Sequence, residues 1–282
     1  MSTAFSSLVL LAAIGQVAAR QNSSQHDADK ANQASLERMV ADLSEFELSI
    51  ASEPPKKLAL SGAAVLRWTY PIRNVDDAAA FVWLGKERPE AVATVMSYRD
   101  RSQNLRRAYE FLSLSQDRLA AVKSGQRVWH PEKPGFTWRG VPGAPPPADT
   151  TAGRRRQMHD LAARFQVAVQ SDKNRYELRL LAQPLYRYQN AKADILDGSL
   201  FALVEGTDPE LLLALESSAD EPGWKFAAGR LTRFAIEVRY LDKVVSEFEQ
   251  ISGAVDDADV YHISDAGPLD PASKPRAGSR GR

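Results

Sequence analysis

The chain has 282 residues, enough for one large domain or two of ordinary size, and 44% of them are hydrophobic, which suffices for a buried core. Lysine plus arginine equals aspartate plus glutamate at 36 each, so the formal net charge is zero. This balance excludes a general electrostatic attraction to nucleic acid or an anionic membrane, but not a local basic patch. The chain has no cysteine, which excludes disulfides and a lipid-modified cysteine anchor.

Residues 1–19 have the pattern of a secretory signal peptide. The apolar run Leu8–Ile14 is followed by Val17, Ala18 and Ala19, although no lysine or arginine precedes the run. The alternatives are a membrane anchor and a buried apolar helix, but so short a run cannot span a bilayer. We expect export to the periplasm or the extracellular space, cleavage after Ala19, and no transmembrane segment in the mature chain.

The first half then reads as one amphipathic helix followed by antiparallel strands. Helical spacing of apolar residues, ended by the prolines at 54 and 55, occurs at Leu36, Met39, Val40, Leu43 and Phe46. Alternation and turn residues predict strands at 65–68, 79–84, 91–97, 108–115, 119–122 and 127–129. The 79–84 and 91–97 strands form a hairpin turned by residues 85–89.

A proline-rich connector follows at residues 130–148. Six prolines and three glycines between His130 and Pro147 exclude a regular helix and a central strand. Because Phe136 and Trp138 are too apolar for a free linker, we expect the connector to dock on the body of the protein.

The second half resembles the first in the order of its predicted elements. An N-cap at 149–151 precedes helically spaced apolar residues at Met158, Leu161, Ala162, Phe165 and Val169. Strands are expected at 176–180, 224–231 and 234–240, with a second hairpin between the first two. Residues 265–282 are polar and rich in Pro, Gly and Ser, so a disordered tail is expected there.

The two hairpins align without a gap at a spacing of 120 residues. Phe81–Val95 matches Phe201–Leu215, with Pro89 on Pro209 and Glu90 on Glu210. Chance is the alternative, because a helix followed by hairpins is a common order. We favour duplication, which predicts an α+β fold of two tandem repeats, residues 20–129 and 149–264. Each repeat would be one amphipathic helix followed by an antiparallel sheet of about four strands, as in cystatin-like folds by analogy.

Several segments carry a resemblance to a known family. They are RPEAVAT at 88–94, EFLSLS at 110–115, PGAPPPA at 142–148, QPLYRY at 183–188 and DGSLFALVEGTDPE at 197–210. In these the chain resembles an uncharacterised family of predicted exported bacterial proteins, over most of residues 60–245. The resemblance implies export and a shared architecture, and it assigns no activity, ligand or catalytic residue.

No catalytic or metal-binding motif is present in the sequence. The four histidines, His26, His130, His159 and His262, lack metal-ligand spacing, and there is no nucleophile elbow, P-loop or dinucleotide-binding motif. We therefore expect no metal, cofactor or assigned catalytic residue. Glu90 and Glu210 would form an acid/base pair if the repeats faced each other, but exposed turn residues are the favoured interpretation.

Two weak binding sites are suggested by residue type. Arg154, Arg155 and Arg156 begin the second helix, where cations oppose the helix dipole, so they are candidates for an anion site. A solvated helix face is the alternative. Candidates for a ligand-binding sheet face are the aromatic residues Trp68, Trp83, Tyr186, Tyr188 and Trp224, for which ordinary core packing is the alternative.

These observations favour a non-enzymatic exported module that binds a partner protein or a small amphiphilic ligand. One alternative is a hydrolase that uses Asp/Glu acid-base chemistry between the repeats. A structural envelope protein is the other.

Overall fold

The computed structural model describes residues 26, 29–85, 88–171, 174–220 and 223–269. The chain divides into two compact units, residues 1–42 with 273–282 and residues 43–272. In the first unit residues 29–42 are helical, and the helix continues to residue 44. The predicted signal peptide lies outside the described residues. In the part of the chain that is described, no helix is long and apolar enough to cross a membrane.

Both halves of the sequence lie within the second unit. The strands of the first half, which we define as residues 43–129, are β1 (Phe46–Ile50), β2 (Lys56–Lys57), β3 (Ala59–Leu60), β4 (Leu66–Tyr70), β5 (Val75–Gly85), β6 (Arg88–Arg99), β7 (Leu105–Ser113), β8 (Leu119–Lys123) and β9 (Gln126–Trp129). A short 3-10 helix, η1 (Pro71–Arg73), joins β4 to β5.

The second half, which we define as residues 149–248, begins with helix α2 (Thr151–Ala162), whose N-cap Thr150 accepts a hydrogen bond from Gly153 N. The elements after the helix are β11 (Phe165–Gln170), β12 (Arg175–Glu177), β13 (Arg179–Leu180), β14 (Tyr186–Asn190), η2 (Ala191–Ala193), β15 (Ile195–Glu205), β16 (Asp208–Ser218), β17 (Trp224–Arg230), β18 (Ala235–Tyr240) and β19 (Lys243–Phe248). Two further strands lie outside the halves, β10 (Arg139–Gly140) and β20 (Tyr261–Pro268).

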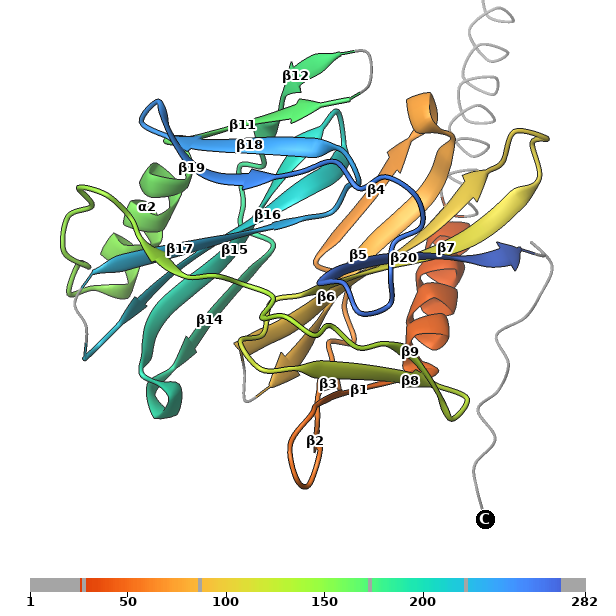
Figure 1. Ribbon diagram of the computed structural model, residues 1–282, viewed down its shortest axis with the longest axis horizontal. Helices are drawn as coiled ribbons and strands as arrows, with labels where there is room; N and C mark the ends of the chain where they lie inside the picture. Colours follow the sequence, from red (N-terminus) through yellow and green to blue (C-terminus); the bar gives the residue numbers. More distant parts are fainter. Residues whose placement is uncertain (1–25, 27–28, 86–87, 172–173, 221–222, 270–282) are drawn as a thin grey trace, which may run out of the picture. The chain divides into compact units, whose positions relative to one another are not determined.

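The described residues form a mostly-β α+β fold with four antiparallel sheets (Figure 1). Each half contains one four-stranded sheet, in the orders β2-β1-β8-β9 and β12-β11-β18-β19. Each half also contributes to a six-stranded sheet, β20-β7-β6-β5-β3 with β4 on β5, or β10-β17-β16-β15-β13 with β14 on β15. The prediction of a single sheet of about four strands in each half was therefore wrong, because strands from before and after each long hairpin pair with each other in a second sheet.

The central core lies between the two six-stranded sheets. Alternate residues of β5, Ala78, Ala80 and Val82, belong to the same buried cluster as Leu200 and Ala202 of β15. Side chains on successive strand residues point to opposite faces, so the residues between them face away from this core. Phe201 accordingly packs with Met158 and Leu161 of α2 in a separate cluster.

Both faces of the long hairpin strands are thus buried, which explains why their sequences are almost continuously apolar. Phe81 and Phe201 occupy the same position within β5 and β15, and their exposed fractions are 0% and 1%. Phe81 pairs with Ala93, and Phe201 pairs with Leu213. The two phenylalanines, which the gapless alignment of the hairpins matches, therefore lie at equivalent buried positions.

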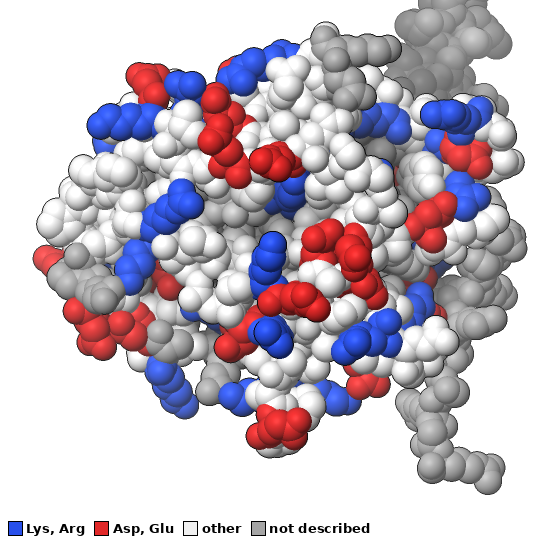
Figure 2. All heavy atoms as spheres, viewed as in Figure 1, with Lys and Arg blue, Asp and Glu red and all other residues white. Residues whose placement is uncertain are grey.

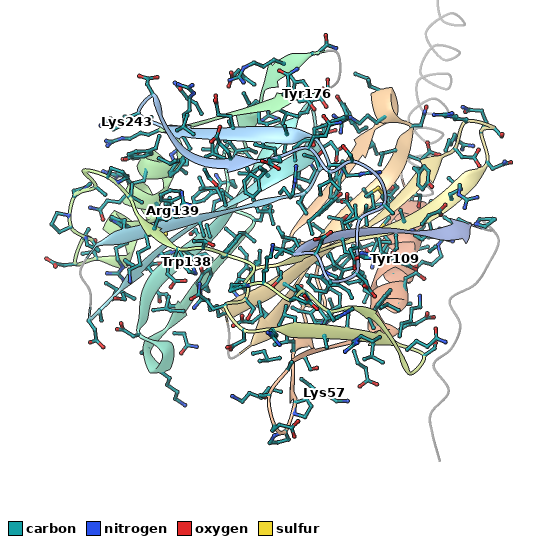
Figure 3. The ribbon with its side chains drawn as sticks, viewed as in Figure 1. Lys57, Tyr109, Trp138, Arg139, Tyr176 and Lys243 are labelled. Atoms are coloured by element: carbon teal, nitrogen blue, oxygen red, sulfur yellow. The ribbon has the colours of Figure 1, made fainter. Side chains whose placement is uncertain are left out.

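The connector is docked on the body, as its aromatic residues indicated. Phe136 is buried in the central core and makes an edge-to-face contact with Trp138, with ring centroids 5.8 Å apart. Trp138 and Arg139 lie along the connector between the two halves (Figure 3). Two residues of the connector form β10, which pairs with the edge of β17.

Two helix predictions were too long. The first helix stops at residue 44, so Phe46 lies in β1, where it pairs with Lys123 and packs edge-on against Tyr109. Helix α2 stops at Ala162, so Phe165 lies in β11 and contacts Tyr240. In both places an alternating strand follows the helix closely, and its first apolar residue continues the helical spacing by coincidence.

The predicted disordered tail was also placed too early. Residues 261–268 form β20, which pairs with β7 from Tyr261 opposite Leu112 to Pro268 opposite Arg106. Figure 1 shows β20 beside β7, among the strands of the first half. The paired backbone compensates for the low apolar content there, and the rest of the predicted tail, from residue 270, lies outside the described residues.

Truncation of either hairpin phenylalanine should destabilise the protein strongly. Phe81→Ala and Phe201→Ala each remove a fully buried ring, and each should lower the free energy of unfolding by about 3–5 kcal/mol. Ile72→Ala is the control, because Ile72 is 84% exposed, and it should change stability by less than about 0.5 kcal/mol. Equilibrium denaturation in urea measures all three. A change below about 1 kcal/mol for either phenylalanine would contradict the burial described above.

Candidate functional site

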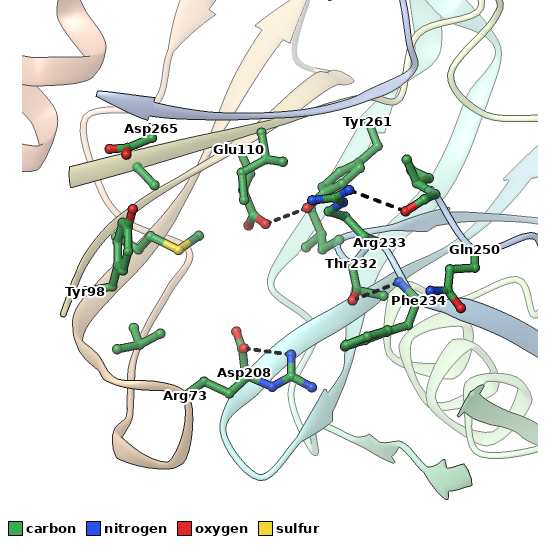
Figure 4. Close-up of a pocket in the computed structure, with 16 residues that line it drawn as sticks. Arg73, Tyr98, Glu110, Asp208, Thr232, Arg233, Phe234, Gln250, Tyr261 and Asp265 are labelled. Carbon is green, nitrogen blue, oxygen red and sulfur yellow. Dashed lines mark hydrogen bonds and ion pairs between the residues drawn. The ribbon is translucent and has the colours of Figure 1, made fainter. Parts of the chain in front are cut away.

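A cleft of about 550 Å³ opens at one end of the central core (Figure 4). One wall comes from β6, β7 and β20 on the first half's sheet, and the other comes from the start of β16 and the segments at 231–234 and 250–251. Its apolar lining is Val75, Met96, Ala108, Leu231, Phe234, Ile251, Tyr261 and Ile263, and its charged lining is Arg73, Glu110, Asp208, Arg233 and Asp265. The size and the mostly apolar walls with a few charged groups are typical of small-molecule sites.

Glu110 is the most buried charged group of the cleft. It lies on β7 directly opposite Thr94 of β6, on the face that continues into the central core. Thr94 Oγ1 donates a hydrogen bond to Glu110 Oε2, and Tyr261 of β20 donates one to Oε1, both at 2.7 Å. Burial raises the pKa of Glu110 to about 8, against the lowering effect of the two hydroxyl groups. At neutral pH its carboxyl group is therefore largely protonated.

Asp208 approaches the same space from the other half. Its Oδ1 accepts a hydrogen bond of 3.0 Å from Trp68 Nε1, and Arg73 Nη1 lies 3.7 Å from its Oδ2. Burial raises the pKa of Asp208 to about 6, and the charge of Arg73 opposes this shift. Asp208 is thus mostly ionised at neutral pH, and Figure 4 shows its carboxylate and that of Glu110 pointing into one space.

Arg73 of η1 connects the halves beneath this cleft. Its guanidinium binds Glu205 and Glu210 of the second half, and its Nη2 donates a 2.9 Å hydrogen bond to Tyr176 Oη. One arginine therefore faces three carboxylates, including Asp208, so the cluster carries excess negative charge when all of them are ionised.

Glu210 is not the exposed turn residue that its sequence position suggested. It is 1% exposed, and burial raises its pKa to about 7 while Arg73 opposes the shift. Glu90 is half-buried, and burial raises its pKa as well. The two glutamates are not brought together as an acid/base pair. The electrostatic neighbours of Glu90 are Ser115, Arg88, Asp117 and Glu216, none of which is shared with Glu210.

The five aromatic candidates do not form one ligand-binding face. Trp68 belongs to the central core, and Tyr186 packs against that core and stacks on Tyr188. Trp83 contacts Phe111 on the opposite face of the same sheet, and Trp224 lies in the core beneath α2. None of the five lines the cleft.

The arginine triplet divides between two environments. Arg154 is buried and binds Asp197 Oδ2 at 3.0 Å, and it also donates to the carbonyl groups of Ala148 and Asp149. Arg155 and Arg156 are exposed and line a separate hollow. Among the described residues no group of three or more histidine or acidic side chains is arranged to hold a metal ion.

Sequence reasoning missed Arg73, Glu110 and Asp208. Glu110 carried a usable signal, because it is a lone acid on the inward-facing side of the apolar strand Leu105–Ser113. Arg73 and Asp208 carried none, since each lies beside a turn, and only the contact between the halves buries them.

The stability of the protein should fall as pH rises through the range in which Glu110 loses its proton. Between the ordinary pKa of 4.5 and the folded value of about 8, the folded state holds a proton that the unfolded state has lost. Glutamine does not titrate, so the stability of Glu110→Gln lacks this pH dependence. The melting temperature of the variant minus that of the wild type should therefore increase from pH 5 to pH 9. The exposed Glu132→Gln is the control and should track the wild type. Thermal unfolding followed by circular dichroism measures the difference, and parallel curves for Glu110→Gln and wild type would contradict it.

Comparisons of the chain with protein-family models, with curated proteins and with solved structures find no match.

Proposed function

We propose that this protein is a non-enzymatic binding module whose cleft holds a small amphiphilic ligand with a cationic group. The observation that carries the proposal is the cleft itself, in which apolar walls surround the carboxyl groups of Glu110 and Asp208. The apolar body of the ligand would lie against residues such as Met96, Phe234 and Ile251.

The charges around the cleft favour a cation over an anion. Within the described part of the chain, Glu110 is held by hydroxyl groups and no cation, and Asp208 shares Arg73 with Glu205 and Glu210. Of the other charged residues of the lining, Asp265 forms an ion pair with Arg106, and the side chain of Arg233 donates to the carbonyl of Gly253. A cation placed between Glu110 and Asp208 would lower the pKa of both and, at neutral pH, would expel the proton that Glu110 holds.

We also propose that the two halves are tandem repeats of one unit. Support comes from the same order of the strands and of the 3-10 helix in both halves, and from the matching strand orders of the four sheets. The pairing of the hairpin strands shifts register after Val75 and after Ile195, and the residue before each strand, Asn74 or Asp194, has a positive φ. Similar costs for Phe81→Ala and Phe201→Ala are expected from this proposal.

The ligand proposal is tested with octylamine, octanol and octanoate, which share one alkyl chain and differ in charge. Isothermal titration calorimetry should show that octylamine binds most tightly. The affinity for octylamine should increase as pH rises from about 6 to about 8. At the higher pH the carboxyl groups are already ionised, so binding no longer has to release their protons. Titrations in buffers with different ionisation enthalpies should show proton release.

The double variant Glu110→Gln with Asp208→Asn should lose the preference for octylamine. The control Glu132→Gln with Asp220→Asn removes two acids that are exposed and lie outside the cleft, and it should retain the preference. Equal affinity of the wild type for the three compounds would refute the proposal that the ligand is cationic. Absence of binding by all three would favour the structural envelope protein.

A hydrolase is the second candidate, because the cleft presents a largely protonated Glu110 and a largely ionised Asp208 together. In this case nitrophenyl glycosides or esters should be turned over, with activity greatest between about pH 6 and pH 8. Glu110→Gln would then abolish turnover while leaving substrate affinity nearly unchanged. If none of these substrates is turned over, the hydrolase is rejected in favour of the binding module.

We further propose that the protein is exported, on the support of the apolar run Leu8–Ile14 and the small residues up to Ala19. N-terminal sequencing of protein from its native host should find Arg20 as the first residue. A chain that still begins at Met1 or Ser2 would refute export by cleavage.

A further inference from the structure

A second hollow, of about 570 Å³, lies in the second half on the side of the sheet that faces α2. One wall is α2, and the other consists of the loop at 182–184 with β14 and β15. The charged and titratable side chains that line it are Arg155, Arg156, His159 and Arg187. No carboxylate is among its lining residues in the described part of the chain.

Helix α2 presents a basic stripe to this hollow. Ala152, Arg155, Arg156 and His159 are spaced as i, i+3, i+4 and i+7, so they lie on one face of the helix. Within the described residues the side chains of Arg155 and Arg156 make no hydrogen bond or ion pair. Both lie in the first half of α2, where positive charge opposes the helix dipole, so their placement does not serve helix stability.

The opposite wall adds a further positive charge. Arg187 holds Asp197 through two hydrogen bonds, from Nε at 2.9 Å and from Nη2 at 2.6 Å. Asp197 is fully buried and also binds Arg154, so two arginines share one carboxylate. This triad carries a net positive charge next to the hollow, and its hydrogen bonds fix Arg187 in place.

We propose that this hollow binds a phosphate group, either free or as the terminal group of a larger molecule. Arginine side chains suit this chemistry because the planar guanidinium donates paired hydrogen bonds to an oxyanion. Arg155 and Arg156 would close on the phosphate from the helix, opposite the fixed Arg187. Phe201 and Pro184 provide apolar surface beside it for a carbon-containing substituent. This site is separate from the cleft at Glu110 and does not depend on the function proposed for that cleft.

The test compares the wild type with Arg155→Ala/Arg156→Ala. Inorganic phosphate and phenyl phosphate are titrated by calorimetry, and vesicles containing phosphatidic acid, a lipid that ends in a phosphate group, are tested by co-sedimentation. Loss of two charge-assisted contacts should weaken binding by about tenfold or more, and added salt should weaken wild-type binding. Arg101→Ala/Arg118→Ala is the matched control, because it removes two exposed arginines of the first half.

The arms of the experiment also separate the sources of the phosphate. Binding of either soluble probe that is lost in Arg155→Ala/Arg156→Ala supports a soluble phosphate ligand. Binding of vesicles alone, with the same loss, supports a lipid headgroup. Circular dichroism establishes that each variant is folded. Binding that is equal in the wild type and in Arg155→Ala/Arg156→Ala, or absent with all three probes, overturns the proposal.

Discussion

The face-to-face packing of the two six-stranded sheets is the contact on which the rest of the molecule depends. Its core combines small side chains, such as Ala78, Ala80 and Ala202, with larger ones, such as Leu112 and Leu200. Each of these sheets is also covered on its other face, so the long hairpins have no solvent-facing side. Burial on both faces permits an almost wholly apolar strand, and it makes the register of each hairpin strict.

Two exchanged strands and one arginine reinforce this contact. The segment that leaves the first half forms β10 on the sheet of the second, and the segment that leaves the second half forms β20 on the sheet of the first. Both edges that these strands cover would otherwise expose unpaired backbone groups. Arg73 adds ion pairs from the first half to Glu205 and Glu210 of the second. The cleft lies beside these features, where carboxylates from both halves meet.

Although the formal net charge of the chain is zero, the cleft contains buried carboxyl groups and the hollow beside α2 is lined by arginines. Acidic and basic side chains are interspersed over the face shown in Figure 2, so the net charge conveys nothing about individual sites. Burial raises the pKa of Glu110, Asp208 and Glu210. The protonation of these carboxyl groups therefore responds to the charge of a molecule that binds beside them. The hollow beside α2 differs, because its positive charge comes from arginine side chains.

The sequence by itself determined the hairpins, the docked connector and the matched positions of Phe81 and Phe201. These follow from local alternation, from turn residues and from the composition of residues 130–148. The tertiary structure alone decided the number of sheets, the exchange of β10 and β20, and the burial of Glu210. Each of these depends on pairing between residues far apart in the chain, as in the contact of Arg73 with Glu210. Local patterns report which side of a strand is apolar, and they do not report which distant segment covers it.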